Sequence, residues 1–317
     1  MILDVEKPLL ELEKKIRELQ EVNQAGKVDL SAEIRLLERK ARQLKLSIYQ
    51  NLSPWDRVQI ARHSERPGTL DYVRQVFTDF VELHGDRFFA DDPAVVAGLA
   101  RFRGIPCAVV GHQKGKGTKD NLARNFGMPN PEGFRKAGRV MRLAARFGLP
   151  LFTFVDTPGA YPGIEAEERG QFEAIASNIA LMSELAVPIL TVVIGEGGSG
   201  GALGIALADR VLILENSVYS VISPEGCATI LWRDAAQAEA AAAALGLTSE
   251  VLLRLGLVDE VLAEPLGGAH RDPAATFETV GAALARHLES LQNTEGPRLL
   301  DERYAKYRRM SVFGEAP

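Results

Sequence analysis

The sequence predicts an α/β protein with a layered core, and two observations carry this prediction. Short apolar segments, several of them β-branched, alternate along the middle of the chain with longer segments of helical spacing. That alternation is typical of a sheet covered by helices, because strands buried on both faces are apolar at nearly every position. With 317 residues, 46% of them hydrophobic, the chain is long enough for one large core with appendages or for two domains.

Residues 1–53 are predicted to form a charged helical hairpin. Apolar residues recur at three- and four-residue spacing from Leu9 to Leu19 and again from Leu30 to Ile48, with charged residues between them. Residues 23–26 are the predicted turn, and Asp29 or Ser31 is the predicted N-cap of the second helix. Because both apolar seams are short for an independent coiled coil, we expect an arm that covers the core or a partner subunit.

Residues 54–271 are predicted to form the α/β core, and residues 272–317 to form C-terminal helices that pack on the core or on a partner. The predicted strands are short and apolar: Val95–Phe102, Ile105–Gly111, Leu151–Asp156, Ile189–Ile194, Arg210–Glu215 and Val218–Ile222. The predicted helices fill the gaps between and after them: Gly133–Phe147, Ala166–Leu185, Gly201–Leu207, Ala235–Leu245 and Pro273–Leu291.

Composition excludes several classes of protein. The 37 Lys and Arg against 42 Asp and Glu give a net charge of -5, which argues against nucleic acid or an anionic membrane as a partner. Two cysteines, Cys107 and Cys227, cannot build a disulfide framework or a four-cysteine zinc site, and the five histidines show no metal-ligand spacing. The best apolar run, Leu185–Ile194, is too short to span a bilayer. We therefore expect a cytoplasmic protein without a metal.

The most informative segment is GEGGSGGAL, residues 195–203, where a predicted strand runs into a glycine cluster and then into a helix. Glycine lets backbone N–H groups approach a ligand closely, and the start of a helix adds unpaired donors. The segment therefore predicts an anion site in which Gly200 and Gly201 donate either to a phosphate or to an oxygen that gains charge in a transition state. A tight turn with close helix packing is the alternative.

A second segment, DTPGAYPG at residues 156–163, follows a predicted strand at the edge where α/β sheets bind ligands. Gly159 and Ala160 each offer a backbone N–H, and two prolines stiffen the turn. The polar segment 111–125 contains Lys114 and Lys116, which are candidates for binding phosphates or an acidic partner. A structural double turn and a solvated loop are the alternatives for these two segments.

Two short segments match motifs of other enzyme classes. Residues 156–159 fit the DxxG of GTPases, but the chain has no GxxxxGK[ST] segment to go with it. Residues 197–201 fit GxSxG between a strand and a helix, which leaves a serine hydrolase with Ser199 as nucleophile as an open alternative. Its candidate triad partners lie downstream: Asp209, Asp259, His270 and His287.

Seven segments between Trp55 and Arg271 occur together in one order: HQKG, NFGMPNPEGFRKA, DTPGAYPG, AEERGQ, GEGGSGGALGI, YSVISPEGCA and EPLGGAHR. With them the chain resembles the α subunit of bacterial acetyl-CoA carboxylase carboxyltransferase. The resemblance implies a crotonase-like (ClpP/crotonase) fold, a spiral of ββα units preceded by the helical hairpin. It also implies the transfer of a carboxyl group from carboxybiotin on a carrier protein to acetyl-CoA, which gives malonyl-CoA for fatty acid biosynthesis.

The resemblance further implies partners and site residues. A β subunit with a zinc ribbon would complete an active α2β2 complex, served by a biotin carboxyl carrier protein and an ATP-dependent biotin carboxylase. Gly200 and Gly201 would form the main oxyanion hole with Gly159 and Ala160 as supporting donors, and Lys114, Lys116 and Tyr161 are weaker candidates for substrate binding. A crotonase-type hydratase or isomerase would instead need a side-chain acid or base, for which Glu196 and Glu225 are the candidates.

Overall fold

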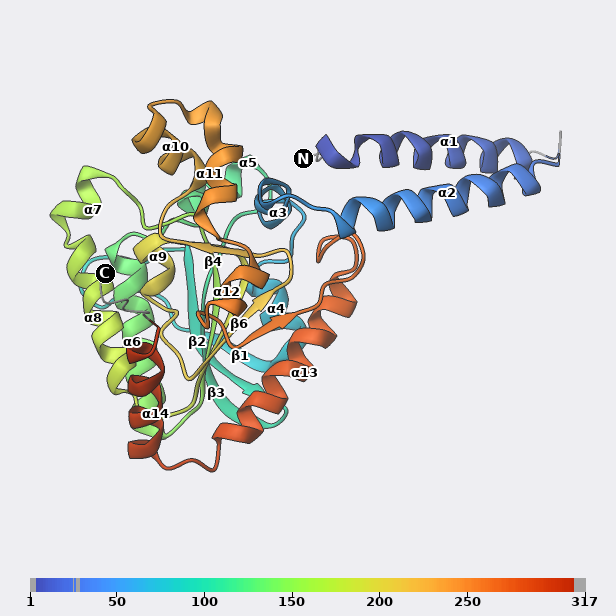
Figure 1. Cartoon of the computed structure of the whole chain (residues 1–317). Coiled ribbons are helices and arrows are strands. Elements are labelled where there is room, and N and C mark those ends of the chain that lie inside the picture. The colour runs from blue at the N-terminus through green and yellow to red at the C-terminus, as the bar shows by residue number, and fades with distance from the viewer. Residues whose placement is uncertain (1–3, 25, 27–28, 311–317) are drawn as a thin grey trace, which may run out of the picture.

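The centre of the molecule is one eight-stranded sheet, seen in a computed structural model that describes residues 4–24, 26 and 29–310 (Figure 1). The strand order is β1-β2-β3-β4-β5-β6-β8, and β7 pairs with β5 beyond the end of β6. The first three strands are antiparallel and the others parallel. The strands are β1 (Thr78–Glu82), β2 (Val95–Phe102), β3 (Ile105–His112), β4 (Leu151–Thr157), β5 (Ile189–Gly198), β6 (Arg210–Leu214), β7 (Val218–Ser220) and β8 (Glu260–Leu262).

Helices surround this sheet and extend from it at the N-terminal end. The hairpin consists of α1 (Lys7–Gln24) and α2 (Ser31–Gln50), after a 3-10 turn at Asp4–Glu6. The core helices are α3 (Pro54–Ala61), α4 (Thr69–Val76), α5 (Thr118–Ala123), α6 (Pro131–Phe147), α7 (Ile164–Glu168), α8 (Gln171–Glu184), α9 (Ser199–Leu203), α10 (Pro224–Trp232), α11 (Ala238–Leu245) and α12 (Ser249–Arg254). The chain ends in α13 (Pro273–Leu291) and α14 (Gly296–Arg308), and further 3-10 turns lie at Asn125–Gly127 and Ala235–Gln237.

Both faces of the sheet are covered, because successive side chains of a strand point to opposite faces. On β3, Ala108 and Val110 join the apolar cluster that contains residues of α6 and α8, whereas Cys107 and Val109 join the cluster that contains residues of α4 and α13. The strands are therefore apolar on both faces, as the sequence predicts for this class of sheet.

All six predicted strands are present, and β2 begins and ends at the predicted residues. The sequence does not predict the edge strands β1 and β8. These strands are only five and three residues long and partly exposed, so they contain no long apolar run. The predicted helix Ala166–Leu185 is two helices, α7 and α8, because Gly170 adopts a φ of 82° that a continuous helix cannot contain. The alanine-rich segment at 235–245 starts as a 3-10 turn before α11.

The helical hairpin packs on itself and projects away from the core (Figure 1). Its apolar seam contains Leu9 and Ile16 from α1 and Ile34 and Ala41 from α2. The predicted N-cap is wrong by one residue: Leu30 holds the cap position, while the Asp29 carboxylate accepts a hydrogen bond from the Ser31 N–H at 3.1 Å. Residues 25, 27 and 28 around the predicted turn lie outside the described residues. The arm does not cover the core, and a partner subunit as its target stays a prediction.

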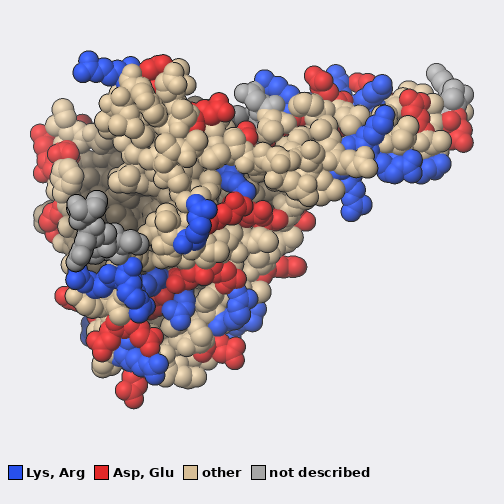
Figure 2. Space-filling model, in the orientation of Figure 1, with Lys and Arg blue, Asp and Glu red and all other residues tan. Residues whose placement is uncertain are grey.

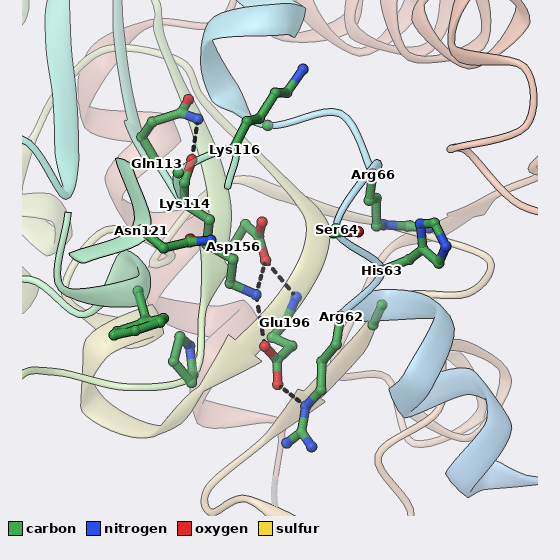
Figure 3. A pocket seen from close by; sticks show the side chains of 15 residues that line it. Arg62, His63, Ser64, Arg66, Gln113, Lys114, Lys116, Asn121, Asp156 and Glu196 are labelled. Carbon is green, nitrogen blue, oxygen red and sulfur yellow. Dashed lines mark hydrogen bonds and ion pairs between the residues drawn. The ribbon is translucent and has the colours of Figure 1, made fainter. Parts of the chain in front are cut away.

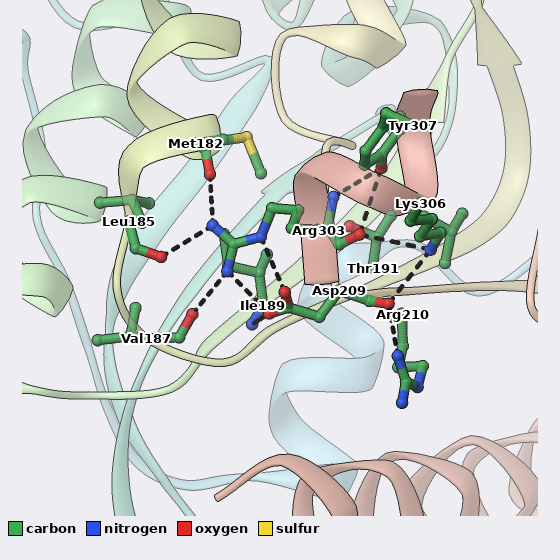
Figure 4. A network of polar contacts seen from close by, with 12 residues as sticks. Met182, Leu185, Val187, Ile189, Thr191, Asp209, Arg210, Arg303, Lys306 and Tyr307 are labelled. Carbon is green, nitrogen blue, oxygen red and sulfur yellow. Dashed lines mark hydrogen bonds and ion pairs between the residues drawn. The ribbon is translucent and has the colours of Figure 1, made fainter. Parts of the chain in front are cut away.

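At the other end of the chain, α14 is fixed to the core by one buried arginine (Figure 4). Arg303 Nε and Nη2 donate to the two carboxylate oxygens of Asp209 at 2.8 and 2.9 Å. The guanidinium also donates to three backbone carbonyls. Those carbonyls belong to Met182, Leu185 and Val187 at 2.7–3.0 Å. All five N–H donors of this guanidinium are therefore used, and α14 is a part of the core.

Candidate active site at two glycine loops

The two glycine-containing loops predicted as ligand sites meet backbone to backbone. One follows β4 and contains Gly159 and Ala160, and the other joins β5 to α9 and contains Gly200 and Gly201. A Cβ atom built on Gly201 would lie 2.5 Å from the Ala160 nitrogen and would also overlap the Gly159 carbonyl carbon. The loops can approach this closely only because residue 201 has no side chain.

The backbone donors of the two loops differ in what they already bind. Gly200 and Gly201 are the second and third residues of α9, so their N–H groups have no carbonyl partner within the helix. The Ala160 N–H makes no hydrogen bond within the described part of the chain, whereas the Gly159 N–H donates to Thr157 Oγ1 at 3.1 Å. Three of the four predicted donors therefore have no hydrogen-bond partner within the described residues, whereas Gly159 is committed to its own turn.

An apolar cavity of about 480 Å³ opens beside Ser199 and Gly200. We call it the apolar cavity; its walls include Ile179, Leu203, Tyr219, Leu252, Tyr307 and Met310. Figure 2 shows a hollow in this region of the molecule, between the α7–α8 segment and α10. Backbone donors beside an apolar cavity suit a ligand that has one polar group and an apolar body.

A second, polar cavity of about 260 Å³ lies at the ends of β3, β4 and β5 (Figure 3). At its base, the Lys114 ammonium lies 2.7 Å from both Asp156 Oδ1 and Glu196 Oε2. The other oxygen of Glu196 accepts a hydrogen bond from Arg62 Nε at 2.6 Å, and Arg62 also binds Glu225 at 2.5 Å. Asp156 accepts the Glu196 N–H at 3.0 Å, which ties the two loop-bearing strands together.

Of the three predicted substrate-binding side chains, the two lysines line the polar cavity, and Tyr161 lies in the loop after β4. The Lys114 side chain points at the carboxylates of Asp156 and Glu196 (Figure 3). The Lys116 side chain points away from Lys114 and forms an ion pair with Asp71 at 2.9 Å. Both lysines line the polar cavity, whereas Gly200 lines the apolar cavity. A phosphate at Lys114 would have to replace one of its carboxylate partners. Tyr161 lies in the first loop, where its N–H donates to the Pro129 carbonyl at 2.9 Å.

Glu196 and Glu225, the candidate acids or bases of a hydratase, are both held by cations. Burial raises the pKa of Glu196, but the charges of Lys114 and Arg62 lower it by more, so the net shift is downward. Burial also raises the pKa of Glu225, and its hydrogen bond from Arg62 turns that shift downward as well. Both side chains are therefore ionised and paired, which does not suit a proton-transferring group.

The serine-hydrolase alternative lacks a general base. Ser199 adopts a φ of 52°, as a nucleophile at a sharp strand-to-helix turn would. No histidine or carboxylate of the described residues lines its cavity. The proposed triad partners are engaged elsewhere: Asp209 with Arg303, Asp259 with Lys306, His270 with the ring of His63, and His287 with Glu260. A serine without a base is not activated for attack.

His112 is fully buried at the end of β3, and neither ring nitrogen has a hydrogen-bond partner within the described residues. Burial lowers the pKa of His112 to about 3, an effect that the nearby Gly201 backbone opposes and the Lys114 charge reinforces. The imidazole is therefore neutral at physiological pH. It lies between the polar network and α9, without contact to solvent.

Sequence reasoning missed Arg62, which joins Glu196 to Glu225 in the site. It lies at the end of α3, 134 positions before Glu196, and nothing in its local sequence marks it. Asp156 was noted only as the first residue of a loop motif, although its carboxylate holds Lys114 and the Glu196 backbone. Contacts over such sequence separations follow from the fold and leave no local pattern.

Comparison with solved structures finds this fold in other proteins. The chain superimposes on the transcarboxylase 12S core with a TM-score of 0.57 and 23% identity, covering 73% of this chain and 44% of that one. It superimposes on a Pseudomonas malonate decarboxylase hetero-tetramer with a TM-score of 0.57 and 19% identity, covering 69% and 90%. The fold is that of the crotonase-type carboxyltransferases.

Sequence comparison gives the particular family. The family model described as acetyl co-enzyme A carboxylase carboxyltransferase-like matches residues 2–311. Proteins named acetyl-coenzyme A carboxylase carboxyl transferase subunit alpha from Burkholderia cenocepacia (strain HI2424) and Burkholderia multivorans are each 59% identical over 313 residues, 99% of this chain and 96% of theirs. The chain belongs to the family of acetyl-CoA carboxylase carboxyltransferase α subunits.

Two further features of the described residues bear on other functions. None of the described helices is long and apolar enough to cross a membrane. No group of three or more histidine, cysteine, aspartate or glutamate side chains within the described ranges is arranged to hold a metal ion.

Proposed function

We propose that this chain supplies the backbone oxyanion holes for carboxyl transfer from carboxybiotin to acetyl-CoA, as the α subunit of an α2β2 carboxyltransferase. The β subunit would carry zinc and much of the acetyl-CoA site. A biotin carboxyl carrier protein would deliver the carboxyl group, and an ATP-dependent biotin carboxylase would reload the carrier in the cytoplasm. The observation that carries the proposal is the backbone contact between Gly201 and the Gly159–Ala160 peptide.

The chemistry needs donors at two oxygens. When the N–CO₂ bond of carboxybiotin breaks, the ureido oxygen gains negative charge, and the biotin nitrogen takes a proton from the methyl group of acetyl-CoA. The resulting enolate carries charge on the thioester oxygen and forms the new C–C bond with CO₂. Backbone N–H groups stabilise both charges without a nucleophilic side chain, which fits a site whose carboxylates are all paired with cations.

We assign the N–H groups of Gly200, Gly201 and Ala160 as the donors, with Gly159 as the residue that shapes the turn. The apolar cavity beside Gly200 would accommodate the apolar part of a substrate. Lys114 would act through Asp156 and Glu196 by fixing the two loops. Lys116, which lines the polar cavity, and Tyr161, in the loop after β4, remain candidates for contact with substrate or partner.

Exposed apolar side chains around the apolar cavity favour a subunit partner on this face. Ile164, Phe172, Val221 and Ile230 are each more than two-thirds exposed, and they belong to α7, α8, the end of β7 and α10. In Figure 1, α10 lies above α9 and α7 lies to its upper left. An exposed apolar rim of this kind marks a protein interface, and a β subunit seated there would close the site.

The test is malonyl-CoA decarboxylation with biocytin as the carboxyl acceptor, which is the reverse reaction. The full chain is assayed alone and then mixed with a zinc-ribbon β subunit. We expect activity only in the mixture, because each subunit would supply part of the site. An inactive mixture, after complex formation has been demonstrated, would refute the proposal. Fluorophosphonate labelling of Ser199 in that case would support a hydrolase.

A further inference from the structure

A groove between α6, α8 and the segment after β1 gathers five arginines around a cavity of about 650 Å³. We call it the arginine groove, and its cations are Arg87, Arg135, Arg139, Arg142 and Arg146. Four of them lie on α6 at three- and four-residue spacing, which places their side chains on one face of the helix. A chain with a net charge of -5 therefore carries a local excess of positive charge here.

Only one of the five arginines is neutralised by carboxylates. Arg135 binds Asp86 at 2.9 Å and Glu132 at 3.1 Å. Asp86 is in turn occupied by backbone N–H groups of its own loop. The other carboxylate of the groove, Glu173, accepts the Ser177 hydroxyl at 2.5 Å.

The four remaining arginines have no ion pair within the described residues. Arg139 donates only to backbone carbonyls of residues 83–85, and Arg87 donates to the His84 carbonyl. Arg146 lies over the Phe147 ring, and Arg142 makes no polar contact in the described part of the chain. Burial and the charge of Arg87 lower the pKa of Arg139, and the charges of Asp91 and Asp86 oppose this shift without reversing it. Like charges held this close are relieved by an anion placed between them.

The arginine groove is separate from the glycine loops, because α8 lies between them. Ile175 and Ile179 face α9: a Cβ on Gly200 would lie 3.7 Å from Ile175, and Ile179 lines the apolar cavity. Ser177 and Asn178 of the same helix line the arginine groove. The groove and the apolar cavity share no lining residue.

The ligand class follows from charge, shape and one aromatic ring. Guanidinium groups pair with phosphate through two parallel hydrogen bonds, and four unpaired cations call for more than one phosphate. The cavity volume is that of a small-molecule site, and the net charge of the chain disfavours a nucleic acid. Beside the groove, Phe88 is 83% exposed, with the Arg135 guanidinium 5.2 Å from its ring centre. An exposed ring of this kind can stack on a nucleobase.

We propose that the arginine groove binds a nucleotide that carries at least two phosphate groups, at a site separate from the one for carboxyl transfer. The phosphate-bearing ligand could be a free nucleotide or the nucleotide portion of CoA itself, which has the same chemistry. We assign the arginine groove to a free nucleotide, because α8 separates the groove from the glycine loops.

The experiment is calorimetric titration of the full chain with ADP and, separately, with inorganic pyrophosphate. The test variant combines Arg142→Ala with Arg146→Ala, because neither side chain has an ion pair that holds the fold. We expect this variant to weaken binding of both ligands by about tenfold or more. Phe88→Ala should weaken ADP by about tenfold and leave pyrophosphate unchanged, since only ADP has a base to stack. Arg254→Ala, an exposed arginine at the end of α12, is the matched control and should change neither.

If the wild type does not bind pyrophosphate, or if the double variant binds it as tightly as the wild type, the arginine groove is not a phosphate site. ADP binding that is unchanged in Phe88→Ala would overturn the nucleotide assignment. The KM for acetyl-CoA of the assembled enzyme separates the two sources. An unchanged KM in the double variant supports a free nucleotide, whereas a KM that rises with the pyrophosphate Kd would assign the groove to CoA. The calorimetric titrations with ADP and pyrophosphate are made without turnover, so their results are independent of the proposed function.

Discussion

At residue 201 a hydrogen atom occupies the place where any other residue would carry a Cβ. The Gly159–Ala160 peptide fills that space, so the two loops are held in a fixed relation. The sequence predicts that a side chain at Gly201 would intrude on the ligand. In the structure it would first strike the neighbouring loop, at the Gly159 carbonyl carbon and the adjacent Ala160 nitrogen, which we assign as a donor.

Gly201→Val should therefore lower kcat for malonyl-CoA decarboxylation by the assembled enzyme by about 100-fold or more, the size of effect seen when one oxyanion donor is lost. Ser199→Ala should change kcat by less than about tenfold, because Ser199 is not assigned as a nucleophile. Gly281→Ala on α13 is the control, since its Cβ would lie 3.6 Å from Val76, an ordinary contact. Full activity of Gly201→Val would show that the site is assigned wrongly.

His112 predicts a pH dependence of stability. Its pKa is about 3 in the fold and 6.5 when unperturbed, so the unfolded chain binds the proton more tightly. The stability that this neutral histidine contributes is fully present above pH 6.5 and is lost as the pH falls from 6.5 toward 3, by about 1.4 kcal/mol per pH unit.

Urea unfolding of the wild type and of His112→Phe at pH 8, 7 and 5.5 measures this loss. The wild type should lose more free energy of unfolding than the variant between pH 7 and 5.5. Between pH 8 and 7 the two proteins should change in parallel, because the histidine is neutral in both states. Equal losses at the lower pH would mean that His112 is not held neutral by the fold.

Among the elements, α14 shows how a helix of charged composition becomes part of a core. Arg303 places a guanidinium among three carbonyls and Asp209, and Tyr307 from the next turn lines the apolar cavity (Figure 4). The buried ion pair between Arg303 and Asp209 therefore helps to position this wall of the cavity, together with the hydrogen bond between Tyr307 and Ala208.

Arg303→Ala should lower the free energy of unfolding by about 3–5 kcal/mol, because it leaves a buried carboxylate without its partner. Arg298→Ala, one turn earlier on α14 and 75% exposed, is the matched control and should change stability by less than about 0.5 kcal/mol. Both are measured by urea unfolding. A loss from Arg303→Ala no larger than that of the control would show that α14 is not anchored as described.

The hairpin is the element whose purpose the isolated chain leaves unexplained. It is attached to the core through Glu6, which accepts hydrogen bonds from Tyr49 at 2.5 Å and from Arg271 at 3.0 Å. Val22, Leu36 and Leu46 remain 40–45% exposed on its surface. A projecting arm with exposed apolar residues suits contact with another subunit.

At the scale of the whole molecule, replacing Val22, Leu36 and Leu46 together by Gln should weaken the complex with the β subunit while the chain stays folded. The reason is that these side chains are not part of the buried hairpin seam. Size-exclusion chromatography of the mixture and circular dichroism of the chain measure the two effects. Val81→Thr with Ile105→Thr, on β1 and β3, is the control. An unchanged complex would show that the hairpin does not contact the partner.

Much of the fold was predictable from local sequence. The six apolar strands, the helix at Pro273–Leu291 and both hairpin helices follow from spacing alone, because burial on a sheet or a helix face imposes a period on the chain. The break at Gly170 and the edge strand Glu260–Leu262 did not, since each depends on what lies next to it in space.

Local sequence was enough to predict an α/β chain with two glycine loops at strand ends and a motif set that matches one family, because glycine positions, apolar periodicity and motif order are local properties. Which groups meet became known from the folded chain alone. It brought Gly201 against Ala160, placed Lys114 between Asp156 and Glu196, and joined Arg62 to Glu196. It also separated Lys114 from the apolar cavity and gathered the arginines of α6 and the β1–β2 segment into one groove. The physical reason is that contacts between distant residues depend on how strands and helices pack, which no local pattern records.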